Sequence, residues 1–139
     1  MNASKQSFPP CSESLDAVIG FVERRSGELQ LPHATCLRLQ LVAEELFTNT
    51  FRHQPCAERI PATVSIEAVG EEVELVYEDS EPEWNPLLHI DRSHLELPVA
   101  QRPVGGLGMV LIQSFAQDLH YERHEGRNRI RVRLRREAG

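Results

Sequence analysis

Lysine, cysteine and long apolar runs are scarce in this sequence, and each shortage excludes a class of protein or site. Lys5 is the single lysine among fifteen basic residues, so a phosphate loop that depends on a following lysine is not expected. No apolar stretch approaches the roughly 18 residues of a membrane-spanning helix, and the start of the chain lacks the apolar centre of a signal peptide. We therefore expect a cytoplasmic protein without a membrane partner.

The three cysteines, Cys11, Cys36 and Cys56, are odd in number and widely spaced. This distribution favours free thiols in a reducing compartment. The pairs His33/Cys36 and His53/Cys56 have a spacing that occurs in zinc sites. They fall at opposite ends of one predicted helix, about twenty residues and roughly 30 Å apart, so shared zinc ligation is excluded.

The remaining composition is that of a soluble globular chain. Its 139 residues suit a single domain over residues 1–139 with one two-layer core. Hydrophobic residues make up 40% and charged residues 26%, which is ordinary for such a domain. The net charge of −6 argues against direct binding of nucleic acid.

Hydrophobic periodicity predicts an α+β chain. Helical spacing of apolar residues predicts helices over residues 12–25, 33–53 and 107–117. Alternation predicts strands over residues 63–69, 73–77, 119–124 and 128–135. Residues 1–11 are expected to be a loose or short extended lead-in, because Pro9-Pro10 prevents a helix. This order predicts a two-layer α/β sandwich, with a mixed sheet covered on one face by about three helices.

Two further stretches have more than one interpretation. Residues 80–104 lack periodicity and are rich in proline, and a loop of this length is usually a functional lid or disorder. The last predicted strand alternates apolar residues with Arg129, Arg131, Arg133 and Arg135. That arginine row suits phosphate or nucleic acid, but the net charge favours a solvated or partner-docking sheet face.

Three segments carry candidate chemistry. Glu45, Asn49 and His53 recur every four residues and share one helical face, which suits either a solvated polar face or a site that holds a metal ion and a water. Asp79 follows an apolar strand, where a carboxylate is displayed at a pocket edge. A glycine-rich turn, residues 105–108, leads into the third predicted helix, where unpaired amides and the helix dipole attract phosphate.

In this order, and with the intervening loop as an ATP lid, these segments resemble the nucleotide-binding motifs of the GHKL (Bergerat-fold) ATPases. Length and the ending Tyr121-Glu-Arg-His-Glu-Gly-Arg-Asn-Arg-Ile-Arg-Val sharpen the resemblance to the anti-sigma-factor serine kinases, bacterial switch proteins of stress and sporulation pathways. The resemblance covers roughly residues 12–135. Its most specific parts are Glu45-x3-Asn49-x3-His53 and Pro103-Val-Gly-Gly-Leu-Gly-Met109.

The resemblance implies ATP and Mg²⁺ as cofactors and a role for each motif residue. Asn49 would give its carboxamide oxygen to Mg²⁺, and Glu45 would be the general base for a serine hydroxyl of a partner protein. His53 would line the nucleotide pocket or fix the loop that follows it. Asp79 would accept a hydrogen bond from the adenine amino group. The phosphate cradle would consist of Gly105, Gly106, Leu107 and Gly108.

The function implied by the resemblance is an anti-sigma factor with serine-protein kinase activity. It would sequester a sigma factor and phosphorylate an anti-anti-sigma antagonist of the STAS type, and since relatives are commonly dimers, a homodimer is compatible with this role. One departure from the family pattern bears on this function. The second motif contains Glu81 where the family has glycine, so we expect less access to positive φ and a negative charge near the polyphosphate. Like charges about 4 Å apart cost on the order of 4 kcal/mol at an effective dielectric constant of about 20.

Two alternatives remain open beside the kinase. The first is a non-catalytic partner-binding module of the same fold, in which nucleotide binding is weak or lost. The second is the catalytic fragment of a two-component histidine kinase, which is disfavoured because no phosphoacceptor helix is expected before residue 12. In the lid, Arg92 and Arg102 suit either contact with a γ-phosphate or an ordinary surface position.

Overall fold

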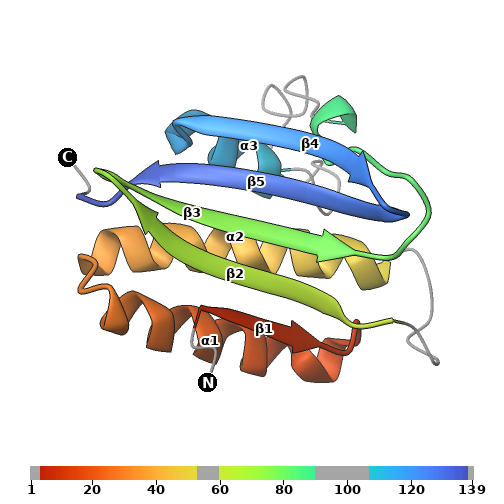
Figure 1. Ribbon diagram of the computed structural model, residues 1–139, viewed down its shortest axis with the longest axis horizontal. Helices are drawn as coiled ribbons and strands as arrows, with labels where there is room; N and C mark the ends of the chain where they lie inside the picture. The colour runs from red at the N-terminus through yellow and green to blue at the C-terminus, as the bar shows by residue number, and fades with distance from the viewer. Residues whose placement is uncertain (1–3, 53–59, 90–106, 138–139) are drawn as a thin grey trace, which may run out of the picture.

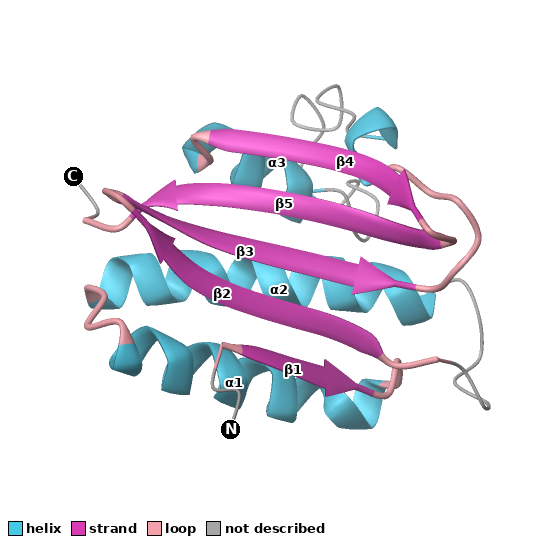
Figure 2. Cartoon of the chain, in the orientation of Figure 1, coloured by secondary structure: helices cyan, strands magenta, loops and turns pink. Residues whose placement is uncertain are grey.

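A computed structural model describes residues 4–52, 60–89 and 107–137. In this part of the chain a five-stranded sheet carries three helices on one face (Figures 1 and 2), which confirms the predicted α+β sandwich. The helices are α1 (Leu15–Glu28), α2 (His33–Arg52) and α3 (Leu107–Phe115). The strands are β1 (Lys5–Phe8), β2 (Ala62–Val69), β3 (Glu72–Asp79), β4 (Asp118–His124) and β5 (Arg127–Arg135). Two short 3-10 turns are η1 (Ser12–Ser14) and η2 (Pro86–His89).

The strands lie in the order β1-β2-β3-β5-β4, and each of these described neighbours is antiparallel to the next. The prediction of a mixed sheet is therefore wrong. Two tight hairpins give the reason: β2 turns into β3 at Gly70, and β4 turns into β5 at Glu125 and Gly126, all with positive φ. The connection through α3 leaves β4 at the sheet edge, so β5 returns between β4 and β3 and runs antiparallel to both.

The N-terminal lead-in contributes the fifth strand, β1, which pairs with β2. Phe8 at its end is 2% exposed. Its ring meets Phe21 of α1 and Phe47 of α2 edge-on, with centroids 5.9 and 6.4 Å apart, a favourable arrangement for aromatic rings. The N-terminal segment is therefore part of both layers: β1 pairs with β2 in the sheet, and the buried Phe8 side chain packs against α1 and α2.

Helix α1 ends three residues later than predicted, at Glu28 rather than Arg25. A glycine inside a helix costs only about 1 kcal/mol relative to alanine, so Gly27 does not stop it. The stop comes at Gln30, which has a left-handed φ of 55°. The Leu31 amide then donates to the Ser26 carbonyl at 3.0 Å, as is common beyond helix ends.

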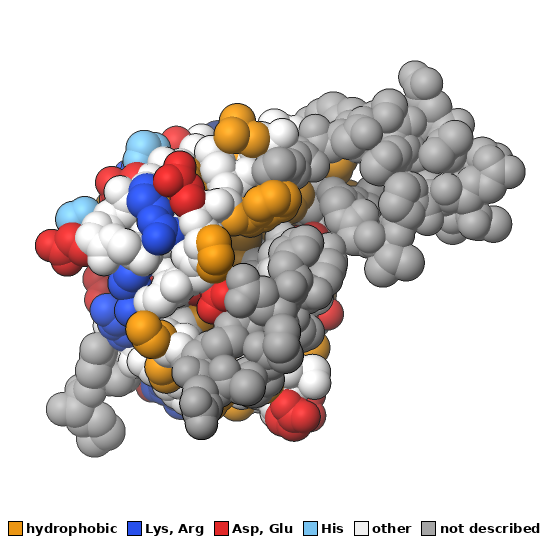
Figure 3. Space-filling model, turned by 90° about the vertical axis from the view of Figure 1, so that its right-hand side faces the viewer, with side chains coloured by type: hydrophobic (Ala, Val, Ile, Leu, Met, Phe, Trp, Pro, Cys, Tyr) orange, Lys and Arg blue, Asp and Glu red, His pale blue; other side chains and the backbone are white. Residues whose placement is uncertain are grey.

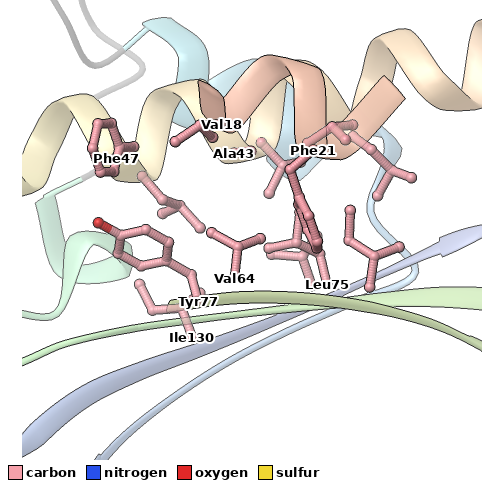
Figure 4. Packing of buried hydrophobic residues seen from close by; sticks show 14 of the residues in the cluster. Val18, Phe21, Ala43, Phe47, Val64, Leu75, Tyr77 and Ile130 are labelled. Atoms are coloured by element: carbon pink, nitrogen blue, oxygen red, sulfur yellow. The ribbon is translucent and has the colours of Figure 1, made fainter. Parts of the chain in front are cut away.

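The core lies between the sheet and the helices (Figure 4). The inward-facing positions of β3 and β5 are at most 4% exposed; they are Val73, Leu75, Tyr77, Ile130, Val132 and Leu134. At one end of the sheet the same inward rows continue with polar residues, Asp79 on β3 and Asn128 on β5, which are 8% and 5% exposed. Two polar side chains therefore extend an apolar surface, next to the end of α2.

The outer face of the sheet carries the arginine row of β5. Carboxylates of β3 and β4 flank it on both sides, so the row is not a free cationic surface. The ion pairs include Arg127–Glu78 at 3.3 Å, Arg129–Glu78 at 3.6 Å, Arg131–Asp118 at 3.3 Å and Arg133–Glu74 at 2.8 Å. This pairing favours a solvated or docking face over a phosphate site.

The cysteine prediction is only partly right. Cys36 is a free thiol, as expected. Cys11 is disulfide-bonded, so the prediction of a free thiol is wrong there, and its partner lies outside the described residues. The wide spacing of the cysteines was a poor guide. Residues far apart in the sequence can lie close together in the fold, and it is the Cα separation in space that decides whether a disulfide forms. Among the helices of the described ranges, none is both long enough and apolar enough to cross a membrane.

Candidate functional site

A cavity of about 140 Å³ opens at the end of the sheet where α2 and β3 finish and β5 begins. A cavity of roughly 150 Å³ is enough to hold a benzene ring, so this one suits a planar aromatic group. Figure 3 looks onto this end of the molecule, where apolar side chains gather beside acidic ones. The cavity is lined by Leu46, Asn49, Thr50, Tyr77, Asp79, Glu81, Pro82, Glu83, Trp84, Pro86, Asn128 and Ile130.

The Asp79 carboxylate is held in the cavity wall by three hydrogen-bond donors. Thr50 Oγ1 donates to Oδ2 at 2.9 Å, Asn128 Nδ2 donates to Oδ1 at 2.9 Å, and the Glu81 amide donates to Oδ1 at 3.2 Å. An ionised carboxylate has about four acceptor positions. Asp79 therefore keeps one acceptor position for a donor group on a ligand in the cavity.

Thr50 and Tyr77 orient that carboxylate from the α2 side. Thr50 is buried, and its hydroxyl lies within hydrogen-bond distance of the Tyr77 hydroxyl as well as of Asp79. Thr50 Oγ1 also lies 3.2 Å from the Leu46 carbonyl. The carbonyl and the carboxylate can only accept, so the Thr50 proton is shared between them, with Asp79 the nearer at 2.9 Å, and the Tyr77 hydroxyl donates to Thr50. In Figure 4 the Tyr77 hydroxyl lies on the side of its ring nearer the helices.

Asn128 links the Asp79 carboxylate to residues 81–84, which form the rim of the cavity. Its Nδ2 donates to Asp79 and to the carbonyls of Glu81 at 3.3 Å and Pro82 at 3.0 Å. Its Oδ1 accepts from the Trp84 amide at 3.1 Å and from the Tyr121 hydroxyl at 2.7 Å. Sequence analysis missed this residue. The available signal was a carboxamide at an inward position of β5, where the following inward residues are Ile, Val and Leu.

The rim is a short acidic segment fixed from β4. The Arg123 guanidinium donates to the Glu81 carbonyl at 2.8 Å. Burial raises the pKa of the Tyr121 phenol, and the charge of Glu83 adds to this, against the opposing effect of Arg123. Trp84 is 40% exposed and brings an aromatic face to the cavity wall.

Glu81 does not adopt a left-handed conformation. Among the described residues other than glycine, positive φ occurs at Gln30 and Glu125, so Glu81 occupies the family's glycine position with an ordinary backbone. This backbone agrees with the expected loss of access to positive φ, and hydrogen bonds from Asn128 and Arg123 hold the segment without a left-handed turn. The charge remains. Glu81, Glu83 and Asp79 all line the cavity, and its described lining holds no arginine, lysine or histidine.

Helix α2 places Asn49 in the cavity lining and Glu45 one turn earlier, beside α3. The Glu45 carboxylate lies against the backbone of Gly108 in the first turn of α3. The structure thus brings together Asn49 and Asp79 at one cavity, and Glu45 and Gly108 at one helix contact. Leu107 begins α3. His53, Gly105 and Gly106 lie outside the described residues.

The donor set suits a magnesium ion that arrives with a nucleotide. Within the described ranges no group of three or more His, Cys, Asp or Glu side chains is arranged to hold a metal. Magnesium is usually bound by one or two protein oxygens together with water and substrate phosphates. The carboxamide oxygen of Asn49, half-buried in the cavity lining, is the oxygen that fits this role.

The five-stranded sheet with three helices on one face is consistent with the fold of GHKL-type ATPase domains. The model of the histidine kinase-like ATPase domain family matches residues 8–134, from the end of β1 into β5. The chain therefore belongs to the histidine kinase-like ATPase domain family, and this membership implies nucleotide binding. A comparison with curated proteins finds no match.

Proposed function

We propose that this chain is an ATP-dependent regulatory switch, a serine-protein kinase that sequesters a sigma factor and phosphorylates its anti-anti-sigma antagonist. The observation that carries the proposal is the buried Asp79 carboxylate, which keeps an acceptor position open in a cavity that also contains Asn49. An exocyclic amine of adenine supplies the matching donor. Such a switch would act in the cytoplasm, and a homodimer fits the role.

The cavity would bind the base, and α2 would carry the phosphates toward the reacting centre. Asn49 stands in the lining of the cavity, and Glu45 lies one helical turn earlier toward α3. Magnesium, when bound with ATP, neutralises phosphate charge and aligns the γ-phosphoryl group. Asn49 would orient it through one oxygen. Since Asp79, Glu81 and Glu83 surround the base, we expect metal-bound ATP to bind better than free ATP.

Glu45 would act as the general base. In the transfer step the serine oxygen of the partner forms a bond to the γ-phosphorus, and its proton passes to the Glu45 carboxylate. The bond from that phosphorus to the β–γ bridging oxygen breaks, and ADP leaves. Positioned acid–base groups of this kind contribute about 10²- to 10⁴-fold in rate.

The kinase proposal is tested by transfer from γ-labelled ATP to a panel of anti-anti-sigma proteins of the STAS type. We expect label on a serine of one partner with the unchanged chain. Glu45→Ala should lower transfer by about 10²- to 10⁴-fold while nucleotide still binds, whereas Asn49→Ala should weaken both. Gly20→Ala, on the exposed side of α1, is the matched control. Tight binding of Mg-ATP with no labelled partner would contradict the kinase part of the proposal.

A second candidate function is a non-catalytic module that only binds partners. It is favoured by one observation, the three carboxylates that line the cavity without a described cation among them. Calorimetric titration of Mg-ATP into the unchanged chain and into Glu81→Gly separates the two. Binding by both variants supports the switch, and binding by Glu81→Gly alone supports the module. If neither variant binds, both the kinase and the nucleotide role of the cavity are wrong.

A further inference from the structure

The five glycines in the described ranges fall into three kinds. Gly70 and Gly126 have positive φ, at 61° and 77°, which explains glycine there. Gly20 and Gly27 lie on α1, and an added Cβ at either would meet no atom within 4 Å. Gly108 is different from both kinds, because it lacks a positive φ and its side-chain space is occupied.

The group that occupies this space is the Glu45 carboxylate. A Cβ built on Gly108 would lie 2.6 Å from Glu45 Cδ and 3.1 Å from Glu45 Cγ, and closer still to Oε2. Real Cβ atoms essentially never show contacts under 3.0 Å. An alanine at position 108 therefore cannot coexist with the present position of the Glu45 carboxylate.

If position 108 were alanine, the Glu45 carboxylate would have to move, because the packing of α2 against α3 holds both helices in place. At the other end of their contact, the Arg38 guanidinium of α2 lies over the Phe115 ring of α3, 5.5 Å from its centroid. Between these contacts, Met109 and Ile112 anchor α3 in the core with 4% and 0% exposure. A retreat of α3 would open a void under these side chains, whereas the end of a glutamate can rotate into another staggered conformation.

We propose that Gly108 is a positioning residue for Glu45. The absence of a side chain at the first turn of α3 lets the Glu45 carboxylate lie against that turn, where the positive end of the helix dipole favours a carboxylate. The inference rests on the proposed function for its catalytic meaning, since Glu45 is the proposed general base. Its steric part depends on the helix contact alone. The family resemblance assigned Gly108 to the phosphates, and this neighbour was not identified from sequence.

The kinetic test compares Gly108→Ala with Gly20→Ala, using Mg-ATP turnover measured as phosphate released to water. We expect Gly108→Ala to lower kcat by about 10- to 100-fold, because displacements near 1 Å cost this much. Any change in the KM for ATP should be smaller than the change in kcat, since Glu45 does not line the base cavity. Gly20→Ala should leave both values unchanged.

Rescue through Glu45 identifies the cause of this loss. In a Glu45→Ala background Gly108→Ala should cause no further loss of rate, because the displaced group is gone. In a Glu45→Asp background the carboxylate is one methylene shorter and sits near the present Cγ position, so Gly108→Ala should cost less than in the unchanged chain. Additive losses in these backgrounds would overturn the proposal.

Thermal unfolding without nucleotide keeps the inference separate from the proposed function. Gly20→Ala should raise the Tm, because alanine favours helix at an open position. Gly108→Ala should raise the Tm more in the Glu45→Ala background than in the unchanged chain. If the Tm change depends on the Glu45 background but no ATP turnover is detected, the kinase proposal is contradicted while the steric contact between Gly108 and Glu45 is supported. Equal Tm changes in both backgrounds, together with unchanged turnover, would overturn the positioning role.

Discussion

The two faces of strands β3 and β5 carry polar side chains in opposite ways. On the outer face, arginines and carboxylates pair across the strands while remaining partly exposed, for example Arg129 at 40% and Glu78 at 21%. On the inner face, Asp79 and Asn128 are buried and hydrogen-bonded to each other and to the cavity rim. Exposed ion pairs contribute little to stability, whereas a buried polar group without its partner is costly. The outer face carries more charged groups, but we expect it to contribute less to the free energy of unfolding than the inner pair of Asp79 and Asn128.

The largest expected effect comes from Asn128→Asp. This change sets a second carboxylate at the position from which Asn128 Nδ2 now donates to Asp79 at 2.9 Å. Loss of the donor and repulsion between like charges should lower the free energy of unfolding by about 3 kcal/mol at neutral pH. Urea unfolding measures this directly. A loss below about 1 kcal/mol would mean that the inner network is no more important than the outer one.

The next effect is expected from Thr50→Val, which keeps the shape of the side chain and removes its hydroxyl. Asp79 loses one donor and the Tyr77 hydroxyl loses its contact with the Thr50 oxygen, so we expect a loss of about 1–3 kcal/mol. Tyr77→Phe in the same background should then cost little, because the two hydroxyls act as one unit. Fully additive losses would show that Thr50 and Tyr77 are energetically independent.

Arg123→Ala tests the rim and should change stability by less than about 1 kcal/mol, because the side chain is exposed. It removes the donor to the Glu81 carbonyl, so the rim segment should become more accessible. We expect stronger acrylamide quenching of Trp84, the chain's one tryptophan. Unchanged quenching would show that Asn128 alone holds the rim.

The smallest effect is expected on the outer face. Arg129→Ala removes pairs with Glu78 at 3.6 Å and Glu122 at 3.9 Å. Exposed pairs of this length are worth at most about 1 kcal/mol and less in high salt. Urea unfolding at low and high salt measures both expectations. A salt-independent loss larger than that from Thr50→Val would reverse the comparison between the faces.

Local patterns were sufficient to predict the elements of this fold. Periodicity located every described helix and most strands to within about three residues, because side-chain repeats report directly on the buried face. Pairing was less predictable. The mixed-sheet error arose because strand order depends on where the connection through α3 leaves β4, which no short window of sequence contains.

The location of a site residue was predictable where a single motif contains it, while the roles of these residues stay predictions. Asp79 and Asn49 do line one cavity, as their positions at the end of a strand and on a helix face suggested. Asn128 was missed because its importance comes from contacts with Asp79 and Trp84, which are more than forty residues away. The same limit applies to Glu45 and Gly108, whose contact exists only through helix packing.

Titration of Trp84 fluorescence with Mg-ATP tests the central claim most directly. Trp84 lines the same cavity as Asp79, so adenine binding should change its emission with a saturable dependence on ATP. Asp79→Asn should remove this response, because an amide group would face the present donors, whereas Arg129→Ala should respond like the unchanged chain. The account predicts that order. No response of the unchanged chain to millimolar Mg-ATP, or an equal response from Asp79→Asn, would contradict it.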